Sequence, residues 1–545
     1  MSVATVTILS AGKALDPRYE ILSVEVHKEI DRISDARIVL IDGNVTDRTF
    51  ALSDDAFFEP GKKIEIRLRY EGEKDATLFQ GLVARHSVES TATSSRLTVE
   101  LKDPAIKLTQ ARKSAVFTNQ TDDQVIAKLI RDAGLTAGTI AATQPKHATL
   151  VQYYATDWDF ILSRADIQGS VVVVDDGSIS LTKLQPPGSA KHTYQYGLSE
   201  IHDLEFDIDA TTQYSAVDSV GWDIKKQALT APSAAKDTKL GQGNLDGKKL
   251  AGALGFPAYT LSHPVVTDAK ELTAWASARL TRSRLSLIRG RLVVPGFSSV
   301  ALLDTLELTG VGKRFDGKTL ITGITHRVSQ DGWQTELLLG VSPEWFCQRE
   351  NIADCPAAGL LPPVTGLQIG IVDEFVADPD KELRIKVLLP ALAAKTGTVW
   401  ARLASPDAGK ARGYLFWPEK GDEVVVGFLA SDPRQPVILG SLYSSANPPP
   451  GAAGQPSKDN LTKAIVTRKG TVIGFVDNDK AKVFIETAGK NSIVLDDDAQ
   501  SIELTDSHGN SIRMDKNGIV LSSAKDLQIT AKGKVAIQGQ AVDIK

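Results

Sequence analysis

The segment from Gly312 to Thr319 matches the phosphate-binding pattern G-x-x-x-x-G-K-[ST] letter for letter. In such a loop the chain leaves a buried strand and opens a helix, whose N-terminal amides hold the phosphates. Here the following residues, Leu320 to Thr325, are rich in β-branched side chains, which favour a strand over a helix. The segment is therefore predicted to be the turn of a β-hairpin, and nucleotide binding is the weaker alternative.

Carboxylates and histidines offer the next candidates for chemistry. Asp496, Asp497 and Asp498 could supply the oxygen ligands that calcium or magnesium takes, but a turn is due at this point, so solvated turn residues are favoured. His508 lies in a Gly-Asn turn and would bind a metal around a threefold axis only if its side chain pointed inward. The eight histidines are scattered, and neither H-E-x-x-H nor G-x-S-x-G occurs. We therefore expect no catalytic residue, no cofactor and no metal site.

The two cysteines, Cys347 and Cys355, precede the Pro/Gly-rich segment from Pro356 to Pro363. Two cysteines in so long a chain cannot form a disulfide framework. Reduced thiols in a linker are the favoured interpretation, and a labile disulfide or part of a metal site are the alternatives, so their role stays open.

Composition excludes several classes of protein. The 545 residues are 42% hydrophobic and carry a formal net charge of −5, which argues against a general nucleic-acid binder. No run approaches the ~20 apolar residues of a membrane span. The N-terminus lacks the basic and apolar regions of a signal peptide, so synthesis in the cytoplasm is expected.

Periodicity and turn signals predict a mostly β chain of several domains. Helices are expected after an N-cap at Thr121, from Asp157 through Gln168 and from about Asp268 to Ser283. Five short strands, near 367–375, 382–389, 397–404, 423–429 and 436–442, suit a small OB-fold barrel. The predicted domains are a first β-barrel module at 1–110, an α/β insert at 111–200, a second β-module at 201–345, a linker at 346–365, an OB-fold at 366–446, a linker at 447–463 and a β-helix needle at 464–545.

Apolar pairs of the form I-x-L recur every seven to ten residues up to the last residue. Side chains two apart on a strand share a face, so each pair predicts a short strand with one apolar side. The residues of these pairs are Val483, Ile485, Ile493, Leu495, Ile502, Leu504, Ile512, Met514, Ile519, Leu521, Leu527, Ile529, Val535, Ile537, Val542 and Ile544. Two inward residues per strand cannot close a core, so copies of the chain must cover one another. A trimeric β-prism needle, with these residues as its core and trimer interface, is the simplest solution.

Several motifs in one order resemble VgrG-type spike proteins. In the predicted OB-fold they are Arg384–Val387, Trp400–Arg402, Phe416–Pro418, Gly421–Phe428 and Asp432–Tyr443, and upstream they are Phe79–Val83 and Val151–Arg164. The opening segments Ser23–Ile30 and Phe58–Ile66 look more like the compact spikes of extracellular contractile injection systems than like type VI secretion spikes.

This resemblance implies a hub like that of contractile phage tails, with an OB barrel and then a needle. It implies as partners a homotrimer, tube and baseplate proteins, a PAAR-type tip protein, effector cargo and, on contraction, the target membrane, but no nucleic acid. Between OB barrel and needle the chain has no room for a lysozyme domain, and it stops inside the repeat, so any toxin is expected to be a separate protein.

The leading hypothesis is thus a trimeric, non-enzymatic spike of a phage tail-like secretion particle from a bacterium, which carries a membrane-puncturing needle. One alternative is a spike with a glycan- or cell-wall-cleaving site, built on two carboxylates that folding brings together. Another is a tail-fibre-like adhesin, which would not explain the OB motifs. The sequence leaves open which target is pierced, which cargo is carried and whether the particle is released from the cell.

Overall fold

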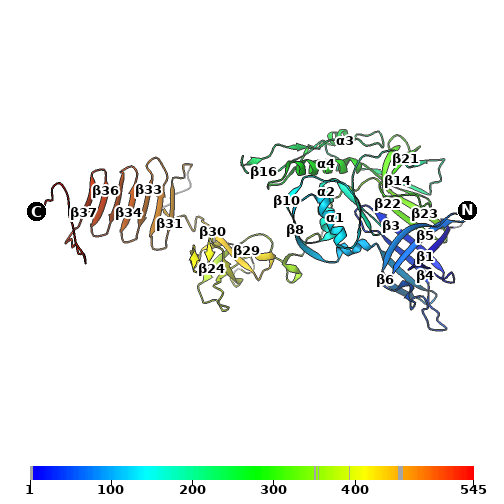
Figure 1. Cartoon of the computed structure of the whole chain (residues 1–545), viewed down its shortest axis with the longest axis horizontal. Helices are drawn as coiled ribbons and strands as arrows, with labels where there is room; N and C mark the ends of the chain where they lie inside the picture. The colour runs from blue at the N-terminus through cyan, green and yellow to red at the C-terminus, as the bar shows by residue number, and fades with distance from the viewer. Residues whose placement is uncertain (1–3, 349–350, 354, 392, 394, 452–457) are drawn as a thin grey trace. The chain divides into compact units, whose positions relative to one another are not determined.

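The computed structural model describes residues 4–545 except 349–350, 354, 392, 394 and 452–457. It forms two compact units, Met1–Asp354 and Cys355–Lys545. Residues 1–3 of the predicted leaderless N-terminus lie outside the described part, as do 349–350 and 354 of the linker 346–365 and 452–457 of the linker 447–463. The expected mostly β fold is confirmed (Figure 1).

The first unit is built on one thirteen-stranded sheet with the order β14-β20-β23-β22-β3-β4-β7-β6-β5-β1-β2, in which β21 lies beside β22 and β13 beside β21. The strands are β1 Ala4–Ser10, β2 Lys13–Ala14, β3 Ile21–Glu29, β4 Asp35–Ile41, β5 Lys63–Tyr70, β6 Ala76–Ser90, β7 Ser95–Lys102, β13 His192–Gln195, β14 Asp203–Ile208, β20 Ile288–Pro295, β21 Thr305–Thr309, β22 Gly317–Ser329 and β23 Gly332–Leu339. Because β22 pairs with β3, strands from the regions 1–110 and 201–345 share this sheet.

An α/β insert follows the first strands of this sheet. Its strands are β8 Arg112–Gln120, β9 Thr136–Ile140, β10 His147–Thr156, β11 Ser170–Asp175 and β12 Ser178–Lys183. Helix α1 spans Asp122–Asp132 and begins at Thr121, which forms a capping box with Gln124, as the sequence predicted. Helix α2 spans Asp157–Ile167 and ends before Gly169, whose φ of +64° a glycine adopts without strain.

A second group of helices and short strands covers residues 210–285. The strands are β15 Val217–Val220, β16 Trp222–Asp223, β17 Ala228–Leu229, β18 Ser233–Ala234 and β19 Tyr259–Ser262, and helix α3 spans Gly247–Ala253. Helix α4 spans Ala269–Leu285, close to the predicted helix, and Asp268 caps it by accepting a hydrogen bond from the Lys270 amide. It buries Leu272, Ala276 and Leu280.

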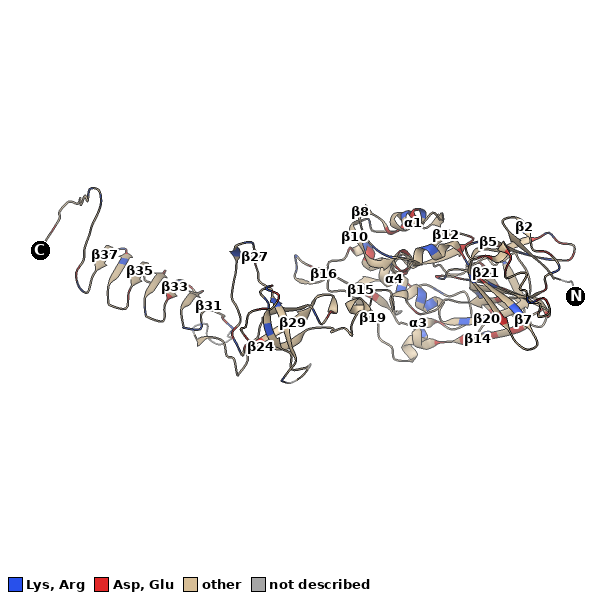
Figure 2. Cartoon of the chain, turned by 90° about the horizontal axis from the view of Figure 1, so that it is seen from below, with Lys and Arg blue, Asp and Glu red and all other residues tan. Residues whose placement is uncertain are grey.

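The second unit starts with a closed five-stranded barrel of order β24-β25-β26-β30-β29. Its strands are β24 Gln368–Glu374, β25 Ile385–Leu388, β26 Thr398–Leu403, β29 Glu423–Phe428 and β30 Pro436–Ser441. All five predicted strands and the OB-like barrel are therefore confirmed. The sequence did not predict the small hairpin of β27 Ala408–Gly409 and β28 Arg412–Gly413, which stands away from the barrel (Figure 2).

A seven-stranded antiparallel sheet follows, which we call the needle sheet. Its strands pair in chain order: β31 Thr462–Val466, β32 Val472–Val476, β33 Lys482–Glu486, β34 Ser492–Asp496, β35 Ser501–Thr505, β36 Ser511–Asp515 and β37 Gly518–Ser522. The first two strands fall at the start of the predicted needle, 464–545. One expectation is corrected here: the sequence predicts strands at 527–529, 535–537 and 542–544, but these pairs lie outside any strand.

Candidate trimer interface

The antiparallel ladders of the needle sheet place the apolar pairs in two columns. A strand in such a ladder reverses direction at each step, so the first member of one pair faces the second member of the next. One column contains Ile465, Ile473, Ile485, Ile493, Leu504, Ile512 and Leu521, and the other contains Phe475, Val483, Leu495, Ile502, Met514 and Ile519.

These columns form an apolar face that the single chain leaves open to water. Ile493 is 40% exposed and Leu495 43% exposed, although each lies in the middle of the sheet. Covering this face with another chain would stabilise the complex by roughly 25 cal/mol for each Å² of apolar surface removed from water. A continuous apolar face of this kind indicates a protein interface.

The space over the first column is a wide, open groove of about 930 Å³. Ile485, Ile493, Leu504 and Ile512 form its apolar floor, and the segment from Ser523 to Leu527 forms one wall. A groove this open is not a small-molecule pocket, because such pockets enclose most of a ligand's surface. Its shape and apolar floor suit side chains of another protein chain.

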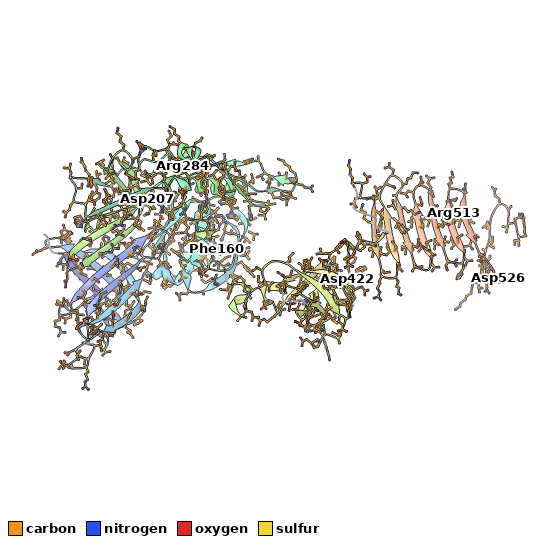
Figure 3. All side chains as sticks on the ribbon, turned by 180° about the vertical axis from the view of Figure 1, so that it is seen from behind. Phe160, Asp207, Arg284, Asp422, Arg513 and Asp526 are labelled. Carbon is orange, nitrogen blue, oxygen red and sulfur yellow. The ribbon has the colours of Figure 1, made fainter. Side chains whose placement is uncertain are left out.

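The opposite face of the needle sheet differs in character along its length. Its central column runs through Ala464, Gly474, Phe484, Val494, Glu503, Arg513 and Val520. Glu503 and Arg513 lie directly opposite each other across β35 and β36, and Arg513 is labelled in Figure 3. The charged part of this face favours contact with water, so the two-column face is the one that needs cover.

Charged side chains stabilise the turns between the needle strands. Lys482 pairs with Asp496 at 3.4 Å, and Lys480 pairs with Asp498 at 3.1 Å. The pKa of the Asp496 carboxyl is lowered, first by a hydrogen bond from the Ala499 amide. Two of the three consecutive aspartates thus have lysine partners, as solvated turn residues would. Among the described residues, no three His, Cys, Asp or Glu side chains are grouped so that they could hold a metal ion.

The turn that contains His508 is closed by Asp506. Its carboxylate accepts hydrogen bonds from the His508 and Asn510 amides at 2.9 Å and from Asn510 Nδ2 at 2.6 Å. These bonds lower the pKa of Asp506, with the Asn510 side chain as the largest cause. The turn places His508 beside the open groove that lies over the first column.

The structure brings together only some of the predicted needle-core residues. Val483 to Leu521 of that set lie on the two columns, whereas Leu527, Ile529, Val535, Ile537, Val542 and Ile544 are exposed and outside any strand. Ile465, Ile473 and Phe475 join the columns although the sequence analysis missed them. The I-x-F spacing of Ile473 and Phe475 was the available signal. The role of the whole set as a trimer interface remains a prediction.

The loop that resembles a phosphate-binding motif joins β21 to β22 in an antiparallel hairpin. Lys318 lies within β22, opposite Glu307, and Thr319 is buried in the same strand. No helix begins there, so the amides that would hold phosphates in such a loop do not converge. The predicted hairpin turn is confirmed.

The first unit brings together two carboxylates, the buried Asp122 and the half-buried Glu271, as a glycan-cleaving site would need. Arg164 Nε contacts Asp122 Oδ1 at 2.7 Å, and its Nη2 contacts Glu271 Oε1 at 2.7 Å. Asp122 has no exposed surface and also accepts a hydrogen bond from Gln168 Nε2. One guanidinium thus holds both carboxylates, as in a structural ion-pair network, where leaving one charge unpaired would cost several kcal/mol.

The two cysteines lie on short 3-10 turns, Cys347 within Phe346–Gln348 and Cys355 before Pro356–Gly359, and both are exposed. Desolvation raises the pKa of the Cys347 thiol, which makes it a poorer nucleophile at neutral pH. Among the described residues, no helix combines the length and apolar character of a membrane span.

Three protein-family models match this chain. Residues 1–330 match the Alg8 N-terminal domain, and residues 368–443 match the type VI secretion system/phage-baseplate injector OB domain. Residues 482–545 match the phage baseplate V C-terminal trimerisation domain, a segment that includes all the predicted needle-core residues. The C-terminal segment is therefore similar to a trimerisation domain.

Several curated relatives of the chain are type VI secretion system spike proteins. It is 25% identical over 434 residues to the type VI secretion system spike protein VgrG3 of Vibrio cholerae, covering 72% of this chain and 39% of that protein. It is 22% identical over 457 residues to the spike protein VgrG1a of Pseudomonas aeruginosa, covering 76% and 67%. The resemblance to VgrG-type spikes is thus confirmed, although the chain spans only about two fifths of VgrG3.

Among solved structures, the chain resembles a component of the type VI secretion system of E. coli. The TM-score is 0.40 at 15% sequence identity, over 80% of this chain and 99% of that one.

Proposed function

We propose that this chain, which belongs to the family of the Alg8 N-terminal domain, is the trimeric central spike of a contractile injection machine. In this proposal contraction of a sheath supplies the work. The chain supplies shape and stiffness, with the first unit as hub, the OB barrel as connector and the needle as the puncturing element. The compact spikes of extracellular contractile injection systems are the subtype that its opening segments favour.

One observation supports this proposal most strongly. Most of the two open columns of the needle sheet, from Val483 to Leu521, lies within the segment 482–545 that matches a trimerisation domain. A hydrophobic face on a segment of this family needs two more copies rather than a ligand. Three such faces turned toward one axis would make a dry core, and three sheets around it would make a stiff rod.

The remaining parts of the proposal concern partners and activity. Tube and baseplate proteins would bind the hub, and a PAAR-type protein would cap the needle, with effector cargo and a target membrane at its far side. We propose a mechanical rather than an enzymatic role, since the single guanidinium of Arg164 binds both Asp122 and Glu271. The bacterial cytoplasm is proposed as the place of assembly.

The test is the mass of the purified full-length chain in solution, measured by sedimentation equilibrium over a range of concentrations. We expect the mass of three chains. Turnover of purified cell-wall material by the same sample is measured beside it. A monomer at all concentrations, or cell-wall turnover that is lost in Glu271→Gln, would overturn the proposal.

A further inference from the structure

The OB barrel carries a second apolar surface, which we call the arm patch. It consists of Tyr414, Leu415, Phe416, Trp417, Leu442 and Tyr443. Phe416 is 61% exposed and Tyr443 71% exposed, although aromatic side chains usually bury most of their surface. Four consecutive large apolar residues on the outside of a small barrel are more than a soluble surface needs.

Most of the patch lies on the segment from Ser405 to Trp417, which we call the arm. Hydrogen bonds hold this segment in a defined conformation. Arg412 Nη1 contacts both carboxylate oxygens of Asp407 at 2.7 Å, and the Tyr414 amide donates to the Asp407 carbonyl at 2.9 Å. Ser405 Oγ donates to the Tyr414 carbonyl at 2.6 Å. These bonds fix the backbone at Tyr414, the first residue of the patch, which lowers the conformational entropy that a contact there must overcome.

The arm patch also borders the needle sheet. Tyr414, Phe416 and Trp417 line an open groove of about 710 Å³ whose other wall is formed by Val466, Thr467 and Arg468 at the end of β31. Arg468 Nη1 pairs with Glu419 Oε2 of the barrel at 2.9 Å, directly beyond the arm. The groove therefore borders the first strand of the sheet whose later strands match the trimerisation domain.

We propose that the arm patch docks on a second copy of this chain, so that the OB barrel is a trimer contact in its own right. This inference rests on the proposed trimer. Copies joined along the needle sheet hold their barrels at a high effective concentration, so even a modest apolar contact forms. Repeated around a threefold axis, the contact is heterologous and closes into a ring, which uses every patch once. Each barrel would then be tied to its neighbour where the needle begins.

The first experiment places a photo-crosslinking phenylalanine analogue at position 416 of the full-length chain. After irradiation we expect covalent products of two and three chains on a denaturing gel. The matched control carries the analogue at Leu383, another apolar barrel position that is 75% exposed and lies outside the arm patch. Between-chain products at 416 and few at 383 support the proposal.

A second variant tests the energetic contribution of the contact. Phe416→Lys changes an exposed side chain and leaves the barrel core intact, whereas Leu383→Lys adds the same charge elsewhere. We expect Phe416→Lys to raise the concentration at which the trimer dissociates by at least about tenfold, and Leu383→Lys to leave it within about twofold.

The outcomes separate this inference from the proposed function. A trimeric wild type without crosslinks at 416, or with dissociation unchanged in Phe416→Lys, overturns the docking of the arm patch and leaves the trimeric spike standing. A wild type that is monomeric at all concentrations overturns both.

Discussion

At the scale of single residues, side chains on the two faces of the needle sheet have different surroundings. Ile512 lies on the two-column face, whereas Val520 lies on the opposite face, directly across from Arg513. Strand geometry makes this assignment, because adjacent side chains point to opposite sides of a sheet. The same substitution at these two positions therefore tests which face is covered.

Ile512→Asp should prevent needle assembly, because an unpaired carboxylate in a dry trimer core costs several kcal/mol. Val520→Asp should assemble, since the new carboxylate faces water and lies opposite Arg513. Protease resistance of the C-terminal segment and the mass in solution report assembly. An intact trimer with unchanged protease resistance in Ile512→Asp would refute the placement of the columns.

The protonation state of His326, in β22, is set by its surroundings. It is buried beside Trp333, with Nδ1 3.0 Å from Thr335 Oγ1. Burial, helped by the charge of Lys28, lowers its pKa from 6.5 to about 3. The imidazole is therefore neutral in the folded hub at every physiological pH.

This shift predicts a pH dependence of hub stability. The folded pKa lies below the unfolded one, so its contribution to stability is fully present above pH 6.5 and is lost progressively as pH falls toward 3. Between pH 6.5 and 5.5, where most carboxylates stay ionised, the unfolding free energy should fall by up to about 1.4 kcal/mol from this group. His326→Gln should flatten that slope in chemical denaturation of the hub unit, and an unchanged slope would contradict the assignment.

At the scale of elements, the needle sheet depends on one glycine at a crowded position. A Cβ added at Gly474 would lie 2.2 Å from Cζ of Phe484, whose ring covers the glycine from the next strand. Gly489, in the turn between β33 and β34, has its nearest neighbouring atom at 3.8 Å from an added Cβ. The ring and the glycine thus form a cross-strand pair that replaces the missing side chain.

Gly474→Ala should therefore displace the Phe484 ring and destabilise the needle by about 1–3 kcal/mol. Gly489→Ala meets no such obstacle and should change stability by about 0.5 kcal/mol or less. The thermal transition of the needle, followed by limited proteolysis across temperature, measures both. Equal effects of the two substitutions would show that Phe484 does not lie on Gly474 in the assembled needle.

At the scale of the whole molecule, the two units differ in whether a single chain can complete them. The first unit is united by the β3–β22 ladder and by Arg327, which pairs with Glu25 and Glu336 at 2.8 Å across three strands. The second unit joins a closed barrel to an open sheet. A closed barrel can fold within one chain, whereas the open sheet exposes an apolar face until copies cover it.

A chain that ends near Pro450 lacks the needle sheet, so it measures how much that sheet contributes to association. It should keep the barrel folded but associate more weakly than the full-length chain, because only the arm patch and any hub contacts remain to hold three copies. Sedimentation equilibrium of both versions at matched concentrations measures this difference. Identical association in the two versions would show that the needle adds nothing to trimer formation.

The sequence by itself determined the elements whose signals are local. The alternation of apolar residues predicted the five barrel strands, Thr121 predicted the start of α1, and the β-branched run after Gly317 predicted a hairpin instead of a phosphate loop. The motifs of the OB region also indicated the VgrG-type relationship that the curated relatives confirm. Each of these signals lies within a few residues of the feature that it predicts.

Only the tertiary structure decided which distant residues share a surface. Strand pairing placed Ile465, Ile473 and Phe475 on the needle columns, joined two sequence regions in one sheet and left the last three apolar pairs outside any strand. Folding of the barrel also left the arm patch exposed. Register and exposure depend on the neighbours that a strand finds, and local sequence patterns do not specify those neighbours.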